Sequence, residues 1–130
     1  MKILGIGVDI IDNKRIRKSI TNKAFIKRIF TSKEILNSRS QKNKTNYFAK
    51  RFAAKESFVK ALGTGFRENL NFKYIEILNN KLGKPYFLNN KKIDKIIFDR
   101  FKVKSSNFFL SISDEKDYSI AFTIIQKKWN

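Results

Sequence analysis

The chain has 130 residues, 42% of them hydrophobic, and its 29 Lys and Arg against 11 Asp and Glu give a formal net charge of +18. It contains neither Cys nor His, which excludes disulfides, thiolate metal sites and a histidine general base. Any metal would have to bind oxygen ligands, as Mg²⁺ and similar hard cations do. The charge attracts anions, and composition alone leaves nucleic acid, an anionic membrane, a phosphorylated small molecule and an acidic protein open.

The length fits a single domain over residues 1–130, because no repeat and no Gly/Ser-rich or Pro-rich linker interrupts the chain. The longest apolar stretch near the start, 3–11, is broken by Asp9 and is too short to span a bilayer. It also lacks the cleavage signature of a secretory signal. We therefore expect no membrane span and a cytoplasmic location.

The first half of the chain predicts one strand followed by helices. Alternation predicts the strand over 2–8, and two or three short basic helices are expected between 12 and 39. Thr31 and Glu34 resemble a capping box that opens one of them. The strongest pattern is a helix over 45–62 that ends at Gly63. Its apolar stripe contains Phe48, Phe52, Phe58, Val59 and Leu62.

The second half predicts mainly strands. We expect strands over 73–78 and near 86–88, and a closing hairpin formed by 107–113 and 118–126. A helix is predicted over 90–101, with an inner face of Ile93, Ile96, Ile97 and Phe101. Helices mixed with strands that are mostly connected by hairpins indicate the α+β class.

Asp9 is the first candidate for a ligand site. In the predicted strand it shares a face with Gly5 and Gly7, which leave its carboxylate unshielded. That arrangement favours a site that a ligand approaches closely. Taken alone, however, Asp9 fits better with an Asp that ends a strand and caps the next helix.

A second candidate lies on the long helix, where Ala49, Ala53, Glu56 and Lys60 fall on one stripe at the edge of the core. The two alanines would leave a shallow space within reach of both charges. By spacing alone, Glu56 and Lys60 are more simply explained as a surface salt bridge between residues i and i+4.

Considered together, Asp9 and Glu56 could share one Mg²⁺, with waters and phosphate oxygens as the other ligands. Lys60 would then meet a further phosphate charge. Arg51 and Lys55 are turned away from this stripe, so they would serve the rim of the site or be solvated.

Two glycine-containing turns and one basic segment complete the candidates. Residues 63–65 are too short for a phosphate-cradling loop, so they read as a helix stop whose backbone amides could face a ligand. Residues 83–86 read as a turn and a possible ligand wall. The basic segment is a solvated helix face, or a surface for an acidic protein or nucleic acid. It contains Lys14, Arg15, Arg17, Lys18, Lys23, Lys27 and Arg28.

Several of these motifs together resemble one enzyme family. Residues 5–10 (GIGVDI) followed by 14–16 (KRI) resemble the opening of holo-(acyl carrier protein) synthases, in the 4'-phosphopantetheinyl transferase family. Residues 51–65 (RFAAKESFVKALGTG) look like the central signature of that family and are the most specific part of the match. Residues 83–86 and 111–113 also fall where the family has counterparts, so the resemblance covers almost the whole chain.

The resemblance implies transfer of 4'-phosphopantetheine from coenzyme A to a serine of apo-acyl carrier protein, releasing adenosine 3',5'-bisphosphate, in support of fatty acid biosynthesis. It also implies a compact α+β fold in which the long central helix packs on a mostly antiparallel sheet. The implied assembly is a homotrimer with active sites between subunits.

The resemblance further implies roles for individual residues. Asp9 and Glu56 would bind Mg²⁺ and act in catalysis with Lys60. The implied contacts with coenzyme A are Arg51, Lys60, Gly63, Gly65, Lys84 and Pro85. The implied surface for the acidic carrier protein is formed by Lys14, Arg15 and Lys18. Because the chain has no His, the base is expected to be a carboxylate or a metal-bound water.

One departure from the family pattern concerns Asp114, because the family commonly has His there. An anionic side chain cannot replace a phosphate contact, so either the position is dispensable or Lys116 compensates. A scaffold that has lost the activity is one alternative. A small basic RNA-binding protein is another, with Tyr47, Phe48 and Phe52 stacking on bases. Most Phe residues follow the periodicity of a core, and no RNA-binding signature is present, so nucleic acid is not the expected partner.

Overall fold

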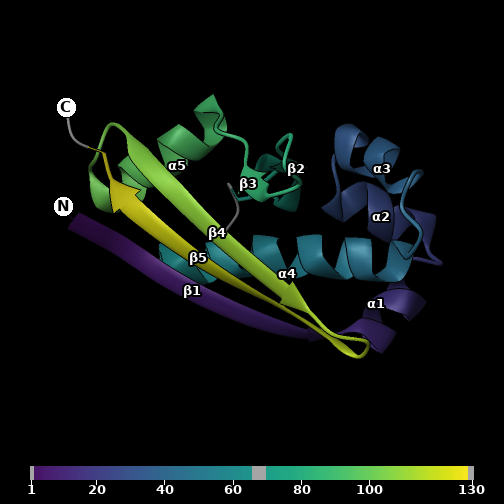
Figure 1. Ribbon diagram of the computed structural model, residues 1–130. Coiled ribbons are helices and arrows are strands. Elements are labelled where there is room, and N and C mark those ends of the chain that lie inside the picture. Colours follow the sequence, from purple (N-terminus) through teal and green to yellow (C-terminus); the bar gives the residue numbers. More distant parts are fainter. Residues whose placement is uncertain (1, 66–69, 129–130) are drawn as a thin grey trace.

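The computed structural model describes residues 2–65 and 70–128. Figure 1 labels its helices and strands in chain order. They are strand β1 (Lys2–Asp12), helices α1 (Asn13–Ser19), α2 (Lys23–Ile29), α3 (Ser32–Ser38) and α4 (Lys44–Leu62), the 3-10 turn η1 (Phe72–Tyr74), strands β2 (Ile77–Asn79) and β3 (Pro85–Phe87), helix α5 (Lys91–Phe101), and strands β4 (Ser106–Asp114) and β5 (Tyr118–Lys127).

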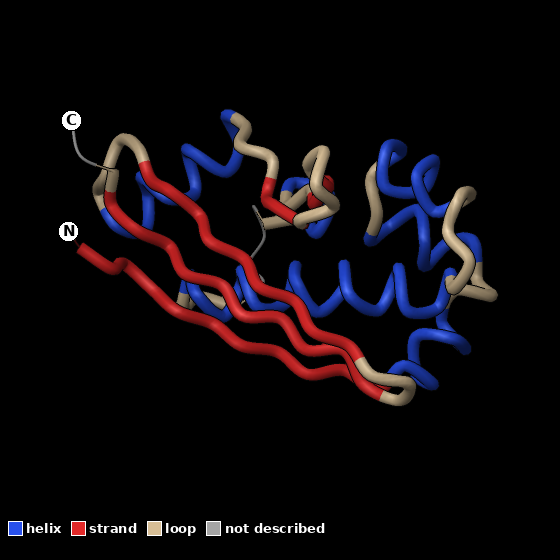
Figure 2. The backbone as a smooth tube through the Cα atoms, in the orientation of Figure 1, coloured by secondary structure: helices blue, strands red, loops and turns tan. Residues whose placement is uncertain are grey.

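A three-stranded antiparallel sheet in the order β1-β5-β4 lies along one side of α4, and β2 and β3 form a separate antiparallel pair. Figure 2 shows α1, α2 and α3 at one end of α4 and α5 near the other end. The predicted α+β class, with the long helix packed on an antiparallel sheet, is confirmed. None of the helices in residues 2–65 and 70–128 is long and apolar enough to cross a membrane.

Helix α4 is the centre of the core, because the sheet covers one of its sides and the smaller elements cover others. All five residues of its predicted apolar stripe are buried. Ala49 and Ala53 are buried completely as well, so the shallow space expected beside them is filled by protein and that prediction was wrong. Asn43 caps the start of the helix, and Gly63 ends it in the left-handed conformation, with φ of 77°.

Two predicted boundaries change for local reasons. The strand expected over 73–78 begins only at Ile77, so most of that prediction was wrong. The side chain of Asn71 accepts a hydrogen bond from the amide of Lys73 at 2.8 Å, which holds the preceding residues in a 3-10 turn. Conversely, β1 continues past Val8 as far as Asp12, whose carboxylate caps α1 through the amide of Lys14.

Asn13 joins the start of α1 to the rest of the molecule. Its side-chain amide donates to the carbonyl oxygens of Glu115 and Lys116 in the β4–β5 turn and to Asn46 at the start of α4, at 3.0–3.2 Å. Its side-chain oxygen accepts a hydrogen bond from Ser119 at 2.8 Å. One buried residue therefore ties three segments together.

Gly5 and Gly7 set the distance between β1 and α4. A Cβ atom on Gly5 would lie 1.9 Å from the carbonyl oxygen of Ala61, and one on Gly7 would lie 2.0 Å from that of Ser57. The glycine face of the strand is therefore occupied by the helix backbone and is not open to a ligand, which corrects the sequence interpretation. The other face of the strand, with Ile6 and Val8, is exposed.

We expect Gly7→Ala to lower the free energy of unfolding by more than about 3 kcal/mol, because the clash is with backbone that can move only by displacing α4. Chemical denaturation with urea measures this change.

Gly83→Ala is the matched control, since Gly83 has a positive φ of 86° but nothing within 4 Å of a new Cβ atom. The free energy of unfolding of this variant should fall by about 1–2 kcal/mol, because only backbone strain acts there. Equal losses in the two variants would contradict the steric explanation.

Candidate functional site

The close contact between β1 and α4 brings Asp9 to the last turns of the helix. The Nζ atom of Lys60 lies 3.1 Å from Oδ1 of Asp9, and this ion pair joins a largely buried carboxylate to a lysine side chain that is 55% exposed. Lys60 thus reaches across to the strand and pairs with Asp9, so the simple surface salt bridge between Glu56 and Lys60 that spacing alone favoured is not the ion pair that Lys60 forms.

Glu56 belongs to the same charged cluster. Burial raises the pKa of its carboxyl group above the ordinary value, and the nearby charge of Asp9 raises this pKa further. Lys60 and Arg15 act in the opposite direction and lower it. The structure thus brings Asp9, Glu56 and Lys60 together as expected, and it adds Arg15 from α1 to their surroundings.

The chemistry of this cluster fits a hard divalent cation. Its two carboxylates come from different elements, and after burial the charge of Asp9 is the next largest cause of the raised pKa of Glu56. Within residues 2–65 and 70–128, no group of three or more acidic, His or Cys side chains could hold a metal ion. A cation held by Asp9 and Glu56 would therefore take its other ligands from water and substrate, as Mg²⁺ commonly does.

Arg51 lies in a different place and is buried, which contradicts its expected position at the rim or in solvent. Its guanidinium carbon lies 3.9 Å from the centre of the Tyr47 ring, and Nη2 donates a hydrogen bond to Oδ1 of Asn79 on β2. Its Nε atom is buried without a hydrogen-bond partner in the described part of the chain. Arg51 borders a cavity of about 320 Å³ together with Lys33, Asn37, Ser40, Gln41, Tyr47, Leu78, Asn79 and Tyr86.

Lys55 was expected at the rim or in solvent, and this prediction was also wrong. Its side chain is completely buried, with Nζ 2.7 Å from Oε1 of Glu34 and 3.0 Å from the carbonyl oxygen of Phe72. Burial lowers the pKa of Lys55, and the charge of Glu34 opposes that shift. The Glu34 carboxylate also accepts hydrogen bonds from the backbone amides of Thr31 and Ile77. The predicted capping box is therefore confirmed, and its carboxylate also binds the first residue of β2.

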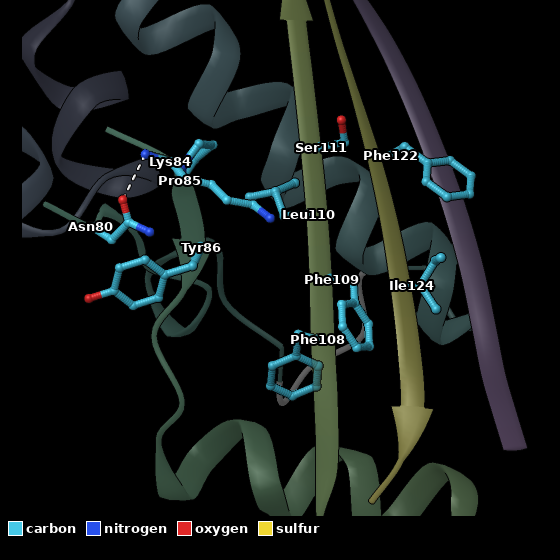
Figure 3. Close-up of a pocket in the computed structure, with 10 residues that line it drawn as sticks. All are labelled: Asn80, Lys84, Pro85, Tyr86, Phe108, Phe109, Leu110, Ser111, Phe122 and Ile124. Carbon is cyan, nitrogen blue, oxygen red and sulfur yellow. Dashed lines mark hydrogen bonds between the residues drawn. The ribbon is translucent and has the colours of Figure 1, made fainter. Parts of the chain in front are cut away.

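The turn that contains Lys84 and Pro85 borders another hollow, of about 480 Å³, between the β2–β3 hairpin and the edge of the large sheet (Figure 3). The backbone amide of Lys84 is held by Oδ1 of Asn80 at 3.0 Å. The remaining lining is mostly apolar and includes Phe109 and Phe122. Gly63 and Gly65 lie elsewhere, at the end of α4, and both have positive φ angles.

The three docking candidates, Lys14, Arg15 and Lys18, are exposed on α1, so this short helix presents a cationic surface. Lys18 also borders a shallow depression of about 440 Å³ that continues to Phe25 and Arg28 on α2. Arg15 belongs to this surface and also acts electrostatically on the Asp9–Glu56 cluster, because its charge lowers the pKa of Glu56.

Asp114 faces the start of α4. Its Oδ2 atom accepts a hydrogen bond from Asn46 at 3.0 Å and lies 4.0 Å from Nζ of Lys50. Lys50, rather than the Lys116 considered from the sequence, is thus the cation found beside Asp114. The negative charge of Asp114 is partly balanced within the chain.

Comparisons with known proteins agree with this architecture. The family model described as the 4'-phosphopantetheinyl transferase superfamily matches residues 5–123. A holo-[acyl-carrier-protein] synthase of Pelagibacter ubique is 63% identical over 128 residues, which cover 98% of this chain and 100% of the relative. One from Fusobacterium nucleatum is 43% identical over 95% of this chain and 98% of its own length.

Solved structures agree as well. The synthase of Neisseria meningitidis has a TM-score of 0.85 and 41% identity, covering 97% of this chain and 100% of that one. The Bacillus anthracis synthase, solved in complex with CoA (3',5'-ADP), has a TM-score of 0.81 and 33% identity, covering 97% and 98%.

The fold and the charged cluster thus belong to a class of group-transfer enzymes. This chain is a member of the 4'-phosphopantetheinyl transferase superfamily and, within it, of the holo-(acyl carrier protein) synthases. The resemblance found in the sequence is confirmed.

We expect Glu56→Gln to raise the thermal unfolding midpoint at neutral pH, measured in metal-free buffer. A raised pKa means that the folded state binds this proton more tightly than the unfolded state. Ionised Glu56 therefore destabilises the fold, and this destabilisation grows as the pH rises through the raised pKa. Because Gln cannot ionise, the rise in the unfolding midpoint should be larger at pH 7 than at pH 4.

Glu115→Gln, at an exposed position in the β4–β5 turn, is the control and should give little difference at either pH. A Glu56→Gln variant with the same midpoint as the wild type at pH 7 would contradict the electrostatic description of the cluster.

Proposed function

We propose that this protein transfers the 4'-phosphopantetheine group of coenzyme A to a serine of apo-acyl carrier protein. The main support is that Asp9, Glu56 and Lys60 meet at one place in a chain closely related to holo-[acyl-carrier-protein] synthases. The serine oxygen forms a bond to the β-phosphorus of coenzyme A, the pyrophosphate bond breaks, and adenosine 3',5'-bisphosphate leaves. The serine proton passes to a base.

In this proposal Asp9 and Glu56 hold Mg²⁺, which when bound would neutralise charge on the pyrophosphate. Lys60 contributes a cation to the same phosphates from the last turn of α4. Phosphoryl transfer depends mainly on positioning and charge stabilisation, which these residues can supply without a covalent intermediate.

The proposed contacts with coenzyme A fall in two places. Asn79, which accepts a hydrogen bond from Arg51, pairs with Pro85 across the β2–β3 hairpin, so Arg51 lies close to Lys84 and Pro85. Arg51 would serve the nucleotide end, Gly63 and Gly65 lie at the end of α4, and Lys84 and Pro85 border the hollow of Figure 3. The separation of these two places within one chain supports active sites that are completed by a second copy.

The outer face of the large sheet supports a homotrimer with such shared sites. Six large apolar side chains on this face are 39–62% exposed. They are Ile6, Val8, Ile10, Phe109, Ile120 and Phe122. Monomers seldom expose so continuous an apolar surface.

The aromatic residues required by the RNA-binding alternative, Tyr47, Phe48 and Phe52, are all buried, so they are not available for stacking on bases. A cytoplasmic location stays a prediction of the sequence.

Incubation with coenzyme A, Mg²⁺ and apo-acyl carrier protein should add one phosphopantetheine to the carrier protein, detected by mass spectrometry. Glu56→Gln should reduce the rate by about a hundredfold or more, because it removes a charged ligand of the proposed metal. Glu115→Gln is the matched control and should transfer at the wild-type rate. Wild-type enzyme that leaves the carrier protein unmodified would refute the proposed function.

Lys18→Glu should raise the KM for the acidic carrier protein about fivefold or more while leaving the KM for coenzyme A unchanged, because it places repulsion on the proposed docking helix. Lys91→Glu on α5 makes the same charge change far along the chain and should have little effect. Equal effects of the two substitutions would mean that only net charge matters.

Phe122→Lys should convert the proposed trimer to monomer, as measured by light scattering, and should abolish transfer with it. A charge in the middle of the apolar sheet face cannot be buried against another copy without a large penalty. Leu82→Lys on the β2–β3 turn, where Leu82 is 95% exposed, is the control and should remain trimeric. A monomeric wild type would exclude the trimer.

A further inference from the structure

The ion pair between Lys60 and Asp9 lies within the proposed metal site. Lys60 Nζ is 3.1 Å from Asp9 Oδ1, so one of the carboxylate oxygens suited to a divalent cation already has a cation beside it. The Asp9 side chain is only 14% exposed, which limits the directions from which a second cation can approach.

The charges around this pair nearly cancel. Asp9 and Glu56 contribute two negative charges, and Lys60 and Arg15 are the cations that act on this cluster. In the described part of the chain no third acidic side chain joins the two carboxylates as a potential ligand. By itself the cluster therefore offers a divalent cation little net attraction.

Lys60 can leave Asp9 without disturbing the core. Its side chain is 55% exposed, and its flexible stem can carry the ammonium group to another anion nearby. Lys55, five residues earlier on α4, is the opposite case, because its ammonium group is completely buried against Glu34. The two lysines of the signature segment thus form one movable ion pair and one fixed ion pair.

We propose that Lys60 is a displaceable counter-ion that couples the binding of Mg²⁺ to the binding of coenzyme A. This rests on the assignment of Asp9 and Glu56 to the metal in the proposed function. A pyrophosphate gives Lys60 another anion and supplies oxygen ligands, so the carboxylate of Asp9 becomes free for the metal. By linkage, each ligand strengthens the binding of the other by the same factor.

Calorimetric titration of Mg²⁺ into the purified enzyme, with and without saturating coenzyme A and without carrier protein, measures this coupling. The wild type should bind Mg²⁺ at least about tenfold more tightly when coenzyme A is present. Lys60→Met should bind Mg²⁺ alone at least about fivefold more tightly than the wild type, because about fivefold is the factor for two unit charges about 4 Å apart in water and Mg²⁺ carries two charges. The increase in Mg²⁺ affinity that coenzyme A produces should be correspondingly smaller in this variant.

Lys60→Arg keeps the cation and should behave like the wild type, and the remote Lys95→Met should not change either titration. Lys60→Met with wild-type or weaker affinity for Mg²⁺ alone would overturn the counter-ion role while leaving the metal site intact. Wild-type enzyme that binds no Mg²⁺ even with coenzyme A would instead overturn the metal assignment of the proposed function.

Discussion

The contact between the glycine face of β1 and the backbone of α4 determines the rest of the structure. Hydrogen atoms at Gly5 and Gly7 let the strand lie against the carbonyl groups of Ser57 and Ala61. This contact places Asp9 beside the last turns of the helix, where Lys60 reaches it. A larger separation between strand and helix would keep the fold class but would move the carboxylate away from its partners.

A second constraint acts on the opposite side of α4, where a buried carboxylate organises three segments. The Glu34 carboxylate accepts hydrogen bonds from Lys55 on α4 and from backbone amides at the start of α3 and on β2. Asn79 lies two residues beyond Ile77 on that strand, and it accepts a hydrogen bond from Arg51. A buried ion pair adds little net stability, but the loss of one partner is expensive because the other charge is left uncompensated. The pair therefore fixes the geometry around Arg51 more than it stabilises the fold.

The sequence predicted the elements well, because helix periodicity, glycine stops and strand alternation are local properties. Spacing alone favoured a structural role for each of Asp9, Glu56 and Lys60. The two carboxylates considered together allowed a shared Mg²⁺ site, and the family resemblance made that site a specific prediction. Alternation in β1 does not show which face is buried, so the sequence alone predicts open space on the glycine face, where the structure places the backbone of α4. Arg51 and Lys55 were placed at the rim or in solvent because their partners, Asn79 and Glu34, are 28 and 21 residues away in the chain. No local sequence pattern predicts such distant pairs, and the sequence predicted only the capping role of Glu34.

The hydrogen bonds of Asn13 hold α1, the proposed docking helix, in place. They bind the first residue of α1 to the β4–β5 turn and to the start of α4, so this helix has a set orientation relative to the charged cluster before anything docks on it. A surface that is already ordered loses little conformational entropy on association. An acidic partner that docks on α1 as proposed would therefore need little rearrangement of this helix.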